Sequence, residues 1–148
     1  MSSSNDIQID PRGYRFGALI TFVLATASLA FGPTTTGIVL AFVLTALFVP
    51  GAVVGPQLTL QSFLFRNLIR PRIGPPEETE SFRPPRFAQQ MGLAMSLAGF
   101  VLGLLGVGVG FYVFFGMVTV ASFLNGIFGY CLGCEIYLLF KRATTKAA

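Results

Sequence analysis

Four long apolar runs constrain the fold of this chain more than any other feature of its sequence. The runs cover residues 14–32, 36–65, 87–107 and 111–140. A helix needs about 20 predominantly apolar residues to cross a hydrocarbon layer ~30 Å thick, and each run is about that long or longer. Because a backbone in lipid must make its hydrogen bonds within its own segment, such runs predict helices rather than open strands. The sequence therefore predicts an all-α, integral membrane four-helix bundle.

Composition indicates that lipid is the solvent for most of the chain. Of the 148 residues, 53% are hydrophobic and 11% are charged, and the mean hydropathy is +0.73. A water-soluble domain of this size rarely has such a composition. The net charge of +4 comes from residues at the ends of apolar runs rather than in a recognition helix, so no nucleic-acid partner is expected. The expected surroundings are a lipid bilayer.

Positive charge is confined to one side of the predicted bundle. Every Lys and Arg lies near the N-terminus, in the middle segment 66–86 or after residue 140, and the turns 32–36 and 106–110 have none. The positive-inside rule then places both termini and the middle segment in the cytoplasm. We therefore expect a multi-pass protein of the inner (plasma) membrane. A cleavable signal peptide is not expected, because the first ten residues carry Asp6 and Asp10 and no basic residue.

The middle segment 66–86 separates two helical pairs. Its five arginines and five prolines predict a semi-rigid cytoplasmic loop rather than a long helix. The predicted organisation is a mobile polar tail over 1–10, a single transmembrane domain over 11–142 and a short tail over 143–148.

The second and fourth runs are longer than a bilayer requires. Each has about thirty residues, or ~45 Å as a continuous helix, so each should tilt strongly or bend near its glycine-rich segment and end along the cytoplasmic interface. Pro50 and Pro56 predict kinks or a break in the second run. The two halves also resemble a parallel repeat of helical hairpins. At a constant offset of 78, the alignment pairs Gly51 with Gly129, Gly55 with Gly133, and Gln57 with Glu135.

Both cysteines of the chain lie in the fourth run, as Cys131 and Cys134. Residues three apart share a helical face, so the two sulfurs can meet, and such a motif can stabilise the N-terminal thiol as a thiolate. We interpret them as candidate catalytic residues. The alternative, that they are small hydrophobic residues in a helix, stays open. The chain has no histidine, so no metal site or bound cofactor is predicted within it, and quinone or lipid binding stays open.

Glu135 is the only acidic residue inside an apolar run. A carboxylate at the edge of a membrane needs a partner, and the arginines at the starts of the first and third helices are the nearest predicted ones. An ion pair with Arg15 or Arg86 could lock the helices together, or it could also tune the thiols. The candidate binding residues are Glu135, Gln57, Arg12, Arg15, Arg86 and Asn125.

Three segments of the chain resemble a known family when they are taken in order. Residues 68–76, 83–89 and 125–137 are similar to the bacterial membrane family called domain of unknown function 4395, and the resemblance extends over 11–140. It implies a four-helix inner-membrane protein and brings no assigned activity. A shorter stretch, 128–131, is similar to the Gly-aromatic-Cys stretch of small membrane domains fused to, or encoded beside, rhodanese and thioredoxin-like proteins. That similarity implies thiol or sulfur handling.

The leading hypothesis is a membrane thiol pair that exchanges electrons or sulfane sulfur with a cytoplasmic thioredoxin-like or rhodanese-like partner, which docks on the arginine-rich loop. One alternative is a non-catalytic accessory subunit of a larger membrane complex, for example a respiratory one, that packs through its glycine faces. Gly99 and Gly103 stand four apart on one helical face, a spacing that allows close helix contact in lipid. Another is a transporter of small solutes or sulfur compounds with a polar site between Gln57 and Glu135. The sequence leaves open whether the protein is an enzyme.

Overall fold

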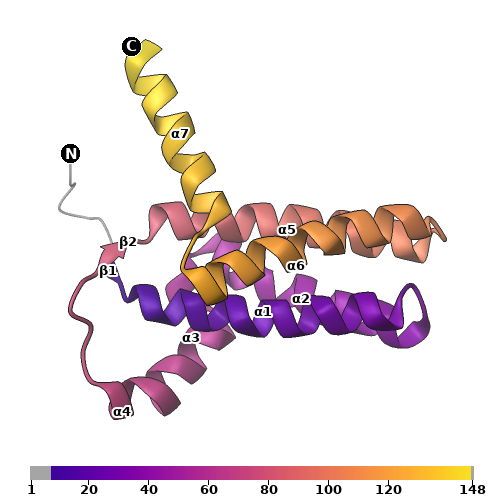
Figure 1. Cartoon of the computed structure of the whole chain (residues 1–148), viewed down its shortest axis with the longest axis horizontal. Helices are drawn as coiled ribbons and strands as arrows, with labels where there is room; N and C mark the ends of the chain where they lie inside the picture. The colour runs from indigo at the N-terminus through magenta and orange to yellow at the C-terminus, as the bar shows by residue number, and fades with distance from the viewer. Residues whose placement is uncertain (1–7, 148) are drawn as a thin grey trace.

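The computed structural model describes residues 8–147 and shows two helical hairpins packed into a four-helix bundle (Figure 1). Four helices are long and apolar enough to cross a membrane. These are α1 (Pro11–Phe31), α2 (Thr35–Val53), α5 (Arg83–Leu104) and α6 (Gly108–Phe128). The predicted fold class is confirmed.

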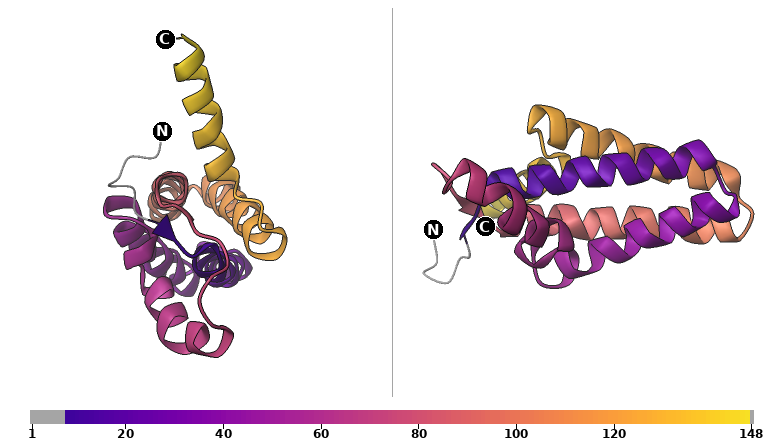
Figure 2. Two further views of the ribbon diagram at one scale, coloured as in Figure 1. Left: turned by 90° about the vertical axis from the view of Figure 1, so that its left-hand side faces the viewer. Right: turned by 90° about the horizontal axis from the view of Figure 1, so that it is seen from below.

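The hairpins pack side by side, so that α1 contacts α2 and α6, and α5 also contacts α2 and α6 (Figure 2). The core lies between the helices, where Ala25, Ala41, Leu44, Phe111 and Phe115 are fully buried. The outer faces remain apolar, as lipid requires, and Val109 for example is 77% exposed. The fold therefore buries a small core and leaves its apolar perimeter for the bilayer.

The glycine face of α5 is used inside the bundle. A Cβ atom at Gly99 would lie 2.8 Å from the ring of Phe115, and one at Gly103 would lie 2.8 Å from the ring of Phe111. Both aromatic side chains belong to α6 and are fully buried. This close packing confirms the expected role of the small residues.

The two hairpin turns lie at one end of the bundle, and the start of α1 and the segment between α2 and α5 lie at the other end (Figure 1). The first turn uses Gly32 at a φ of 65° and Thr34, whose hydroxyl accepts the backbone N–H of Gly37. The second turn uses Gly106 at a φ of 80°. The basic residues belong to the starts of α1 and α5, to the segment between the hairpins and to α7 (Leu132–Ala147), so they gather at the end opposite the turns.

The second apolar run is broken, which is one of the two outcomes that its prolines predicted. Helix α2 continues through Pro50 and ends at Val53, and Gly55 then adopts a φ of 154°. Short helical pieces follow: η1 (Pro56–Leu58), α3 (Leu60–Leu64), η2 (Phe65–Ile69) and α4 (Arg70–Ile73). Arg86 donates from Nη2 to the carbonyl oxygen of Val53 at 2.9 Å, which satisfies one of the acceptors freed where α2 ends.

The fourth run is also broken. Helix α6 ends at Phe128, Gly129 adopts the left-handed conformation at a φ of 71°, and α7 leaves steeply across the bundle end (Figure 1). The breaks at Gly55 and Gly129 are 74 residues apart instead of 78. The predicted pairing of Gly51 with Gly129 is therefore wrong in structural terms, because Gly51 lies inside α2.

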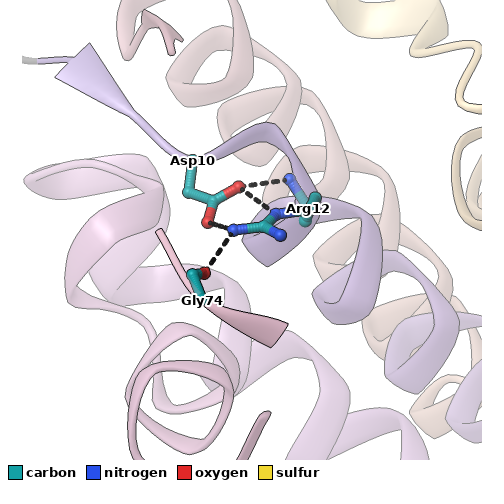
Figure 3. A network of polar contacts seen from close by, with 3 residues as sticks. All are labelled: Asp10, Arg12 and Gly74. Carbon is teal, nitrogen blue, oxygen red and sulfur yellow. Dashed lines mark hydrogen bonds and ion pairs between the residues drawn. The ribbon is translucent and has the colours of Figure 1, made fainter. Parts of the chain in front are cut away.

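A small polar assembly fixes the segment between the hairpins to the start of α1. Two short strands, β1 (Gln8–Ile9) and β2 (Glu80–Ser81), pair antiparallel. Asp10 caps α1 and forms an ion pair with Arg12 at 2.9 Å, and Arg12 also donates to the carbonyl oxygen of Gly74 (Figure 3). Residues 8–10 of the predicted mobile tail are thus part of the fold, and residues 1–7 lie outside the described part of the chain.

This assembly is expected to be sensitive to acid. Burial opposes ionisation of Asp10, but the hydrogen bonds and charge of Arg12 outweigh it, so the pKa of Asp10 lies below its ordinary value of 3.8. The stabilisation is therefore present above pH 3.8 and is lost as the pH falls through the lower folded value. Hydrogen exchange over residues 74–82, corrected for intrinsic rates, should rise on the order of fivefold in that window. An Asp10→Asn variant should show the fast exchange rate at every pH. If this variant instead exchanges as slowly as the wild-type protein above that window, the assignment to Asp10 is contradicted.

Candidate functional site

Cys131 and Cys134 form a disulfide where α6 gives way to α7, with their Cα atoms 5.2 Å apart. Cys131 immediately precedes α7, and its carbonyl oxygen accepts the N–H of Glu135 at 3.0 Å. Its sulfur accepts the backbone N–H of Cys134 at 3.2 Å. Cys131 therefore occupies the N-cap position of α7, where a serine or aspartate oxygen commonly accepts the same kind of bond.

The chain reaches this arrangement because Gly129 ends α6. The N–H of Gly129 donates to Asn125 and the N–H of Tyr130 donates to Leu124, so the last carbonyls of α6 are satisfied by the turn. The prediction that the two sulfurs can meet is confirmed. The expected reason, a shared helical face, does not apply, since Cys131 lies outside α7 and Cys134 lies in its first turn.

Contacts with α5 hold the start of α7 in place. Gly133 packs so closely that a Cβ atom there would lie 2.6 Å from Cα of Ala88. Four residues later, the rings of Tyr137 and Phe87 pack at a tilt of 48° with centroids 5.8 Å apart. The position of the disulfide thus depends on the packing of α7 against α5.

The two cysteines have different surroundings. Cys131 is 8% exposed and lines a partly open cavity between the helices, whereas Cys134 is partly exposed and does not line that cavity. One sulfur therefore faces the protein interior, while the other is the more accessible from outside.

The cavity has a volume of about 880 Å³ and is lined by residues of α1, α2, α5, α6 and α7. Its size falls within the range of small-molecule sites. The lining is mainly apolar, and its side chains include Phe48, Met91 and Met95. Asn125 also lines it, and the Oδ1 atom of this amide is buried with no hydrogen-bond partner in the described part of the chain. An unpaired buried polar atom is uncommon and requires an explanation.

The expected ion pair of Glu135 with Arg15 or Arg86 does not form among residues 8–145. The reason is the break before α7, which turns Glu135 to an exposed position. Arg86 binds carbonyl oxygens at the end of α2, and Arg12 is paired with Asp10. Arg15 lies beside the break, with its guanidinium carbon 3.3 Å from where a Cβ atom of Gly129 would be.

Gln57 and Glu135 do not form a common polar site. Gln57 lines a smaller cavity of about 160 Å³ near the start of α1, and Glu135 lines neither this cavity nor the large one. The Oε1 atom of Gln57 is buried and has no hydrogen-bond partner in the region that the structure covers. The transporter alternative loses the paired site on which it depended.

Sequence reasoning missed the large cavity and therefore missed Gly116, Met117 and Met95, which line it. Apolar residues in a membrane helix carry no signal that distinguishes a cavity wall from a lipid-facing surface. Gly116 alone gives a hint in the structure, because a Cβ atom there would meet nothing within 4 Å. A glycine with empty space beside it indicates room rather than close helix packing.

Comparison with known proteins gives one result. No curated protein and no solved structure shows significant similarity to the chain. The family model described as Domain of unknown function (DUF4395) matches residues 9–142, which is nearly the whole chain, and the protein therefore belongs to this family.

Proposed function

We propose that Cys131 and Cys134 are a thiol–disulfide exchange site for a soluble thioredoxin-like or rhodanese-like partner at the cytoplasmic face. The observation that carries this proposal is the position of Cys131 as the N-cap of α7, bonded to Cys134 within the first turn. Cysteines at helix N-termini in Cys-x-x-Cys motifs are characteristic of disulfide exchange, because the helix end stabilises negative sulfur.

The different exposure of the two sulfurs supports a direction for the exchange. A partner thiolate attacks the accessible Sγ of Cys134, the bond between the cysteines breaks, and Cys131 leaves as a thiolate. The N–H of Cys134, which donates to this sulfur in the disulfide, stabilises the leaving thiolate. A second thiol of the partner then attacks the mixed disulfide and releases Cys134. The partner is oxidised by two electrons and the membrane pair is reduced.

The same reduced pair can also take up sulfane sulfur. A partner persulfide transfers its outer sulfur atom to a thiolate of the pair, and the partner retains its own thiolate. Redox exchange and sulfur relay therefore use the same two residues. They differ in what is transferred, which is a pair of electrons in the first case and a sulfur atom in the second.

Charge at this end of the bundle supports the proposed side and the docking. Arg15 lies beside the break that precedes Cys131, and Lys141 and Arg142 lie on α7 itself. A cluster of cations attracts acidic protein surfaces and, by the positive-inside rule, belongs in the cytoplasm.

Redox titration of the protein in membrane vesicles tests this function. Alkylation followed by mass analysis should show two thiols appearing together as the potential is lowered, with a midpoint between about −120 and −270 mV, the range of Cys-x-x-Cys exchange proteins. A membrane-impermeant maleimide should label reduced Cys134 in inverted vesicles and not in right-side-out vesicles. Cysteines that stay in one state at all potentials would refute the exchange function, and labelling from the opposite side would refute the orientation.

A further inference from the structure

We infer that the cavity behind Cys131 binds a lipid-soluble quinone, which reoxidises the reduced cysteine pair. This inference rests on the exchange function proposed above and names the second redox partner that such a site needs. A pair that accepts two electrons from a soluble protein must pass them on before it can react again.

The position of the cavity favours a ligand from the lipid phase. All four membrane-crossing helices contribute to its wall, and Cys131 and neighbouring residues of α7 close one end of it. Several wall residues of α6 are also exposed on the outer surface, including Tyr112 at 49%, Met117 at 43% and Val120 at 56%. The wall is therefore continuous with the lipid-facing surface, which gives a hydrophobic molecule a route into the bundle.

The lining favours a quinone over an acyl chain. Apolar side chains such as Phe48, Met91 and Met95 suit a flat ring with an isoprenoid tail. Asn125 places a side-chain amide in the lining of the cavity. The NH₂ group of this amide can donate a hydrogen bond to a quinone carbonyl, an acceptor that an acyl chain lacks.

The chemistry of the two partners balances. Two thiols lose two electrons and two protons when they form a disulfide, and a quinone takes up two electrons and two protons to form a quinol. The buried Cys131 thiolate adds to the quinone ring, and Cys134 then attacks Cys131 Sγ. The S–S bond forms, the bond between Cys131 and the ring breaks, and the electron pair leaves with the ring as quinol.

Decylubiquinone is a suitable probe, with full-length protein in phosphatidylcholine nanodiscs. The protein is reduced, freed of reductant and mixed with the quinone, and both free thiols and quinol absorbance are followed. We expect loss of two thiols for each quinol formed, with a rate that saturates as the quinone concentration rises.

Gly116→Phe is the diagnostic variant. Its ring would enter the empty space beside Gly116, so the half-saturating quinone concentration should rise about tenfold. Val109→Phe is the matched control on the same helix, because Val109 is 77% exposed and does not line the cavity. It should behave as wild type. Asn125→Ala should also raise the half-saturating quinone concentration.

Two results would overturn the inference while leaving the proposed function intact. One is that thioredoxin reduces the cysteine pair but the quinone does not oxidise it. This result includes the case in which a phospholipid occupies the cavity and the quinone does not displace it. The other is equal saturation in the Gly116→Phe and Val109→Phe variants, which would place the reaction outside the cavity. A pair that reacts with neither thioredoxin nor quinone would instead refute the exchange function itself.

Discussion

Replacing Cys131 by serine is expected to leave a protein that glutathione disulfide modifies rapidly and stably, whereas Cys134→Ser should leave one that is modified at least about ten times more slowly. The remaining sulfur in the first variant is Cys134, which is partly exposed and outside the cavity. In the second variant it is Cys131, which is 8% exposed. The mixed disulfide on Cys134 should persist in the first variant because its resolving partner is gone.

Serine makes this comparison a controlled one. A serine hydroxyl at position 131 can still accept the N–H of Cys134 and cap α7, so the start of the helix is preserved. Intact-mass analysis after timed quenching gives both rates directly, and the double variant Cys131→Ser with Cys134→Ser should show no adduct. Equal rates, or faster modification of Cys131, would contradict the proposal that partners attack Cys134.

Gly133→Ala is expected to destabilise the docking of α7 by roughly 1–3 kcal/mol, the usual cost of overpacking. The added methyl group would lie 2.6 Å from both Cα and Cβ of Ala88, and backbone atoms cannot move aside as a flexible side chain can. Helix α7 must therefore shift away from α5. Since Cys131 precedes this helix, the disulfide should also become easier to reduce with dithiothreitol.

Thermal unfolding in detergent and the rate of proteolysis after Lys141 measure the loss of docking, and the rate of thiol release in dithiothreitol measures the easier reduction of the disulfide. Gly116→Ala is the matched control, because it also adds one methyl group to a helix but meets nothing within 4 Å. Its higher helix propensity should make it neutral or stabilising by about 0.5–1 kcal/mol. If Gly133→Ala behaves in the same way as this control, the close contact between α7 and α5 is not what positions the site.

The cysteine pair illustrates how far a local pattern can be interpreted. The spacing of Cys131 and Cys134 was sufficient to predict that their sulfurs can meet, because either a helix or a helix start places such residues together. The spacing could not identify Cys131 as an N-cap. The N-cap position depends on where α6 ends, and α6 ends at the left-handed turn of Gly129. A glycine inside an apolar run permits such a turn but does not require it.

Glu135 shows the opposite case, in which a sound general rule predicted the wrong contact. A carboxylate in an apolar run requires a partner only if the run stays in the membrane. Once the run breaks, Glu135 becomes an exposed residue of α7, and its predicted partner Arg86 instead satisfies carbonyl oxygens of α2.

The sequence by itself determined the four membrane-crossing helices, their pairing into hairpins and the gathering of cations at one end, because hydropathy and charge act on each segment separately. Only the tertiary structure decided that a cavity of about 880 Å³ lies behind Cys131 and that Asn125 is left unpaired beside it. A cavity is space that several helices fail to fill together. It therefore depends on how distant residues pack, which no local pattern in the chain records.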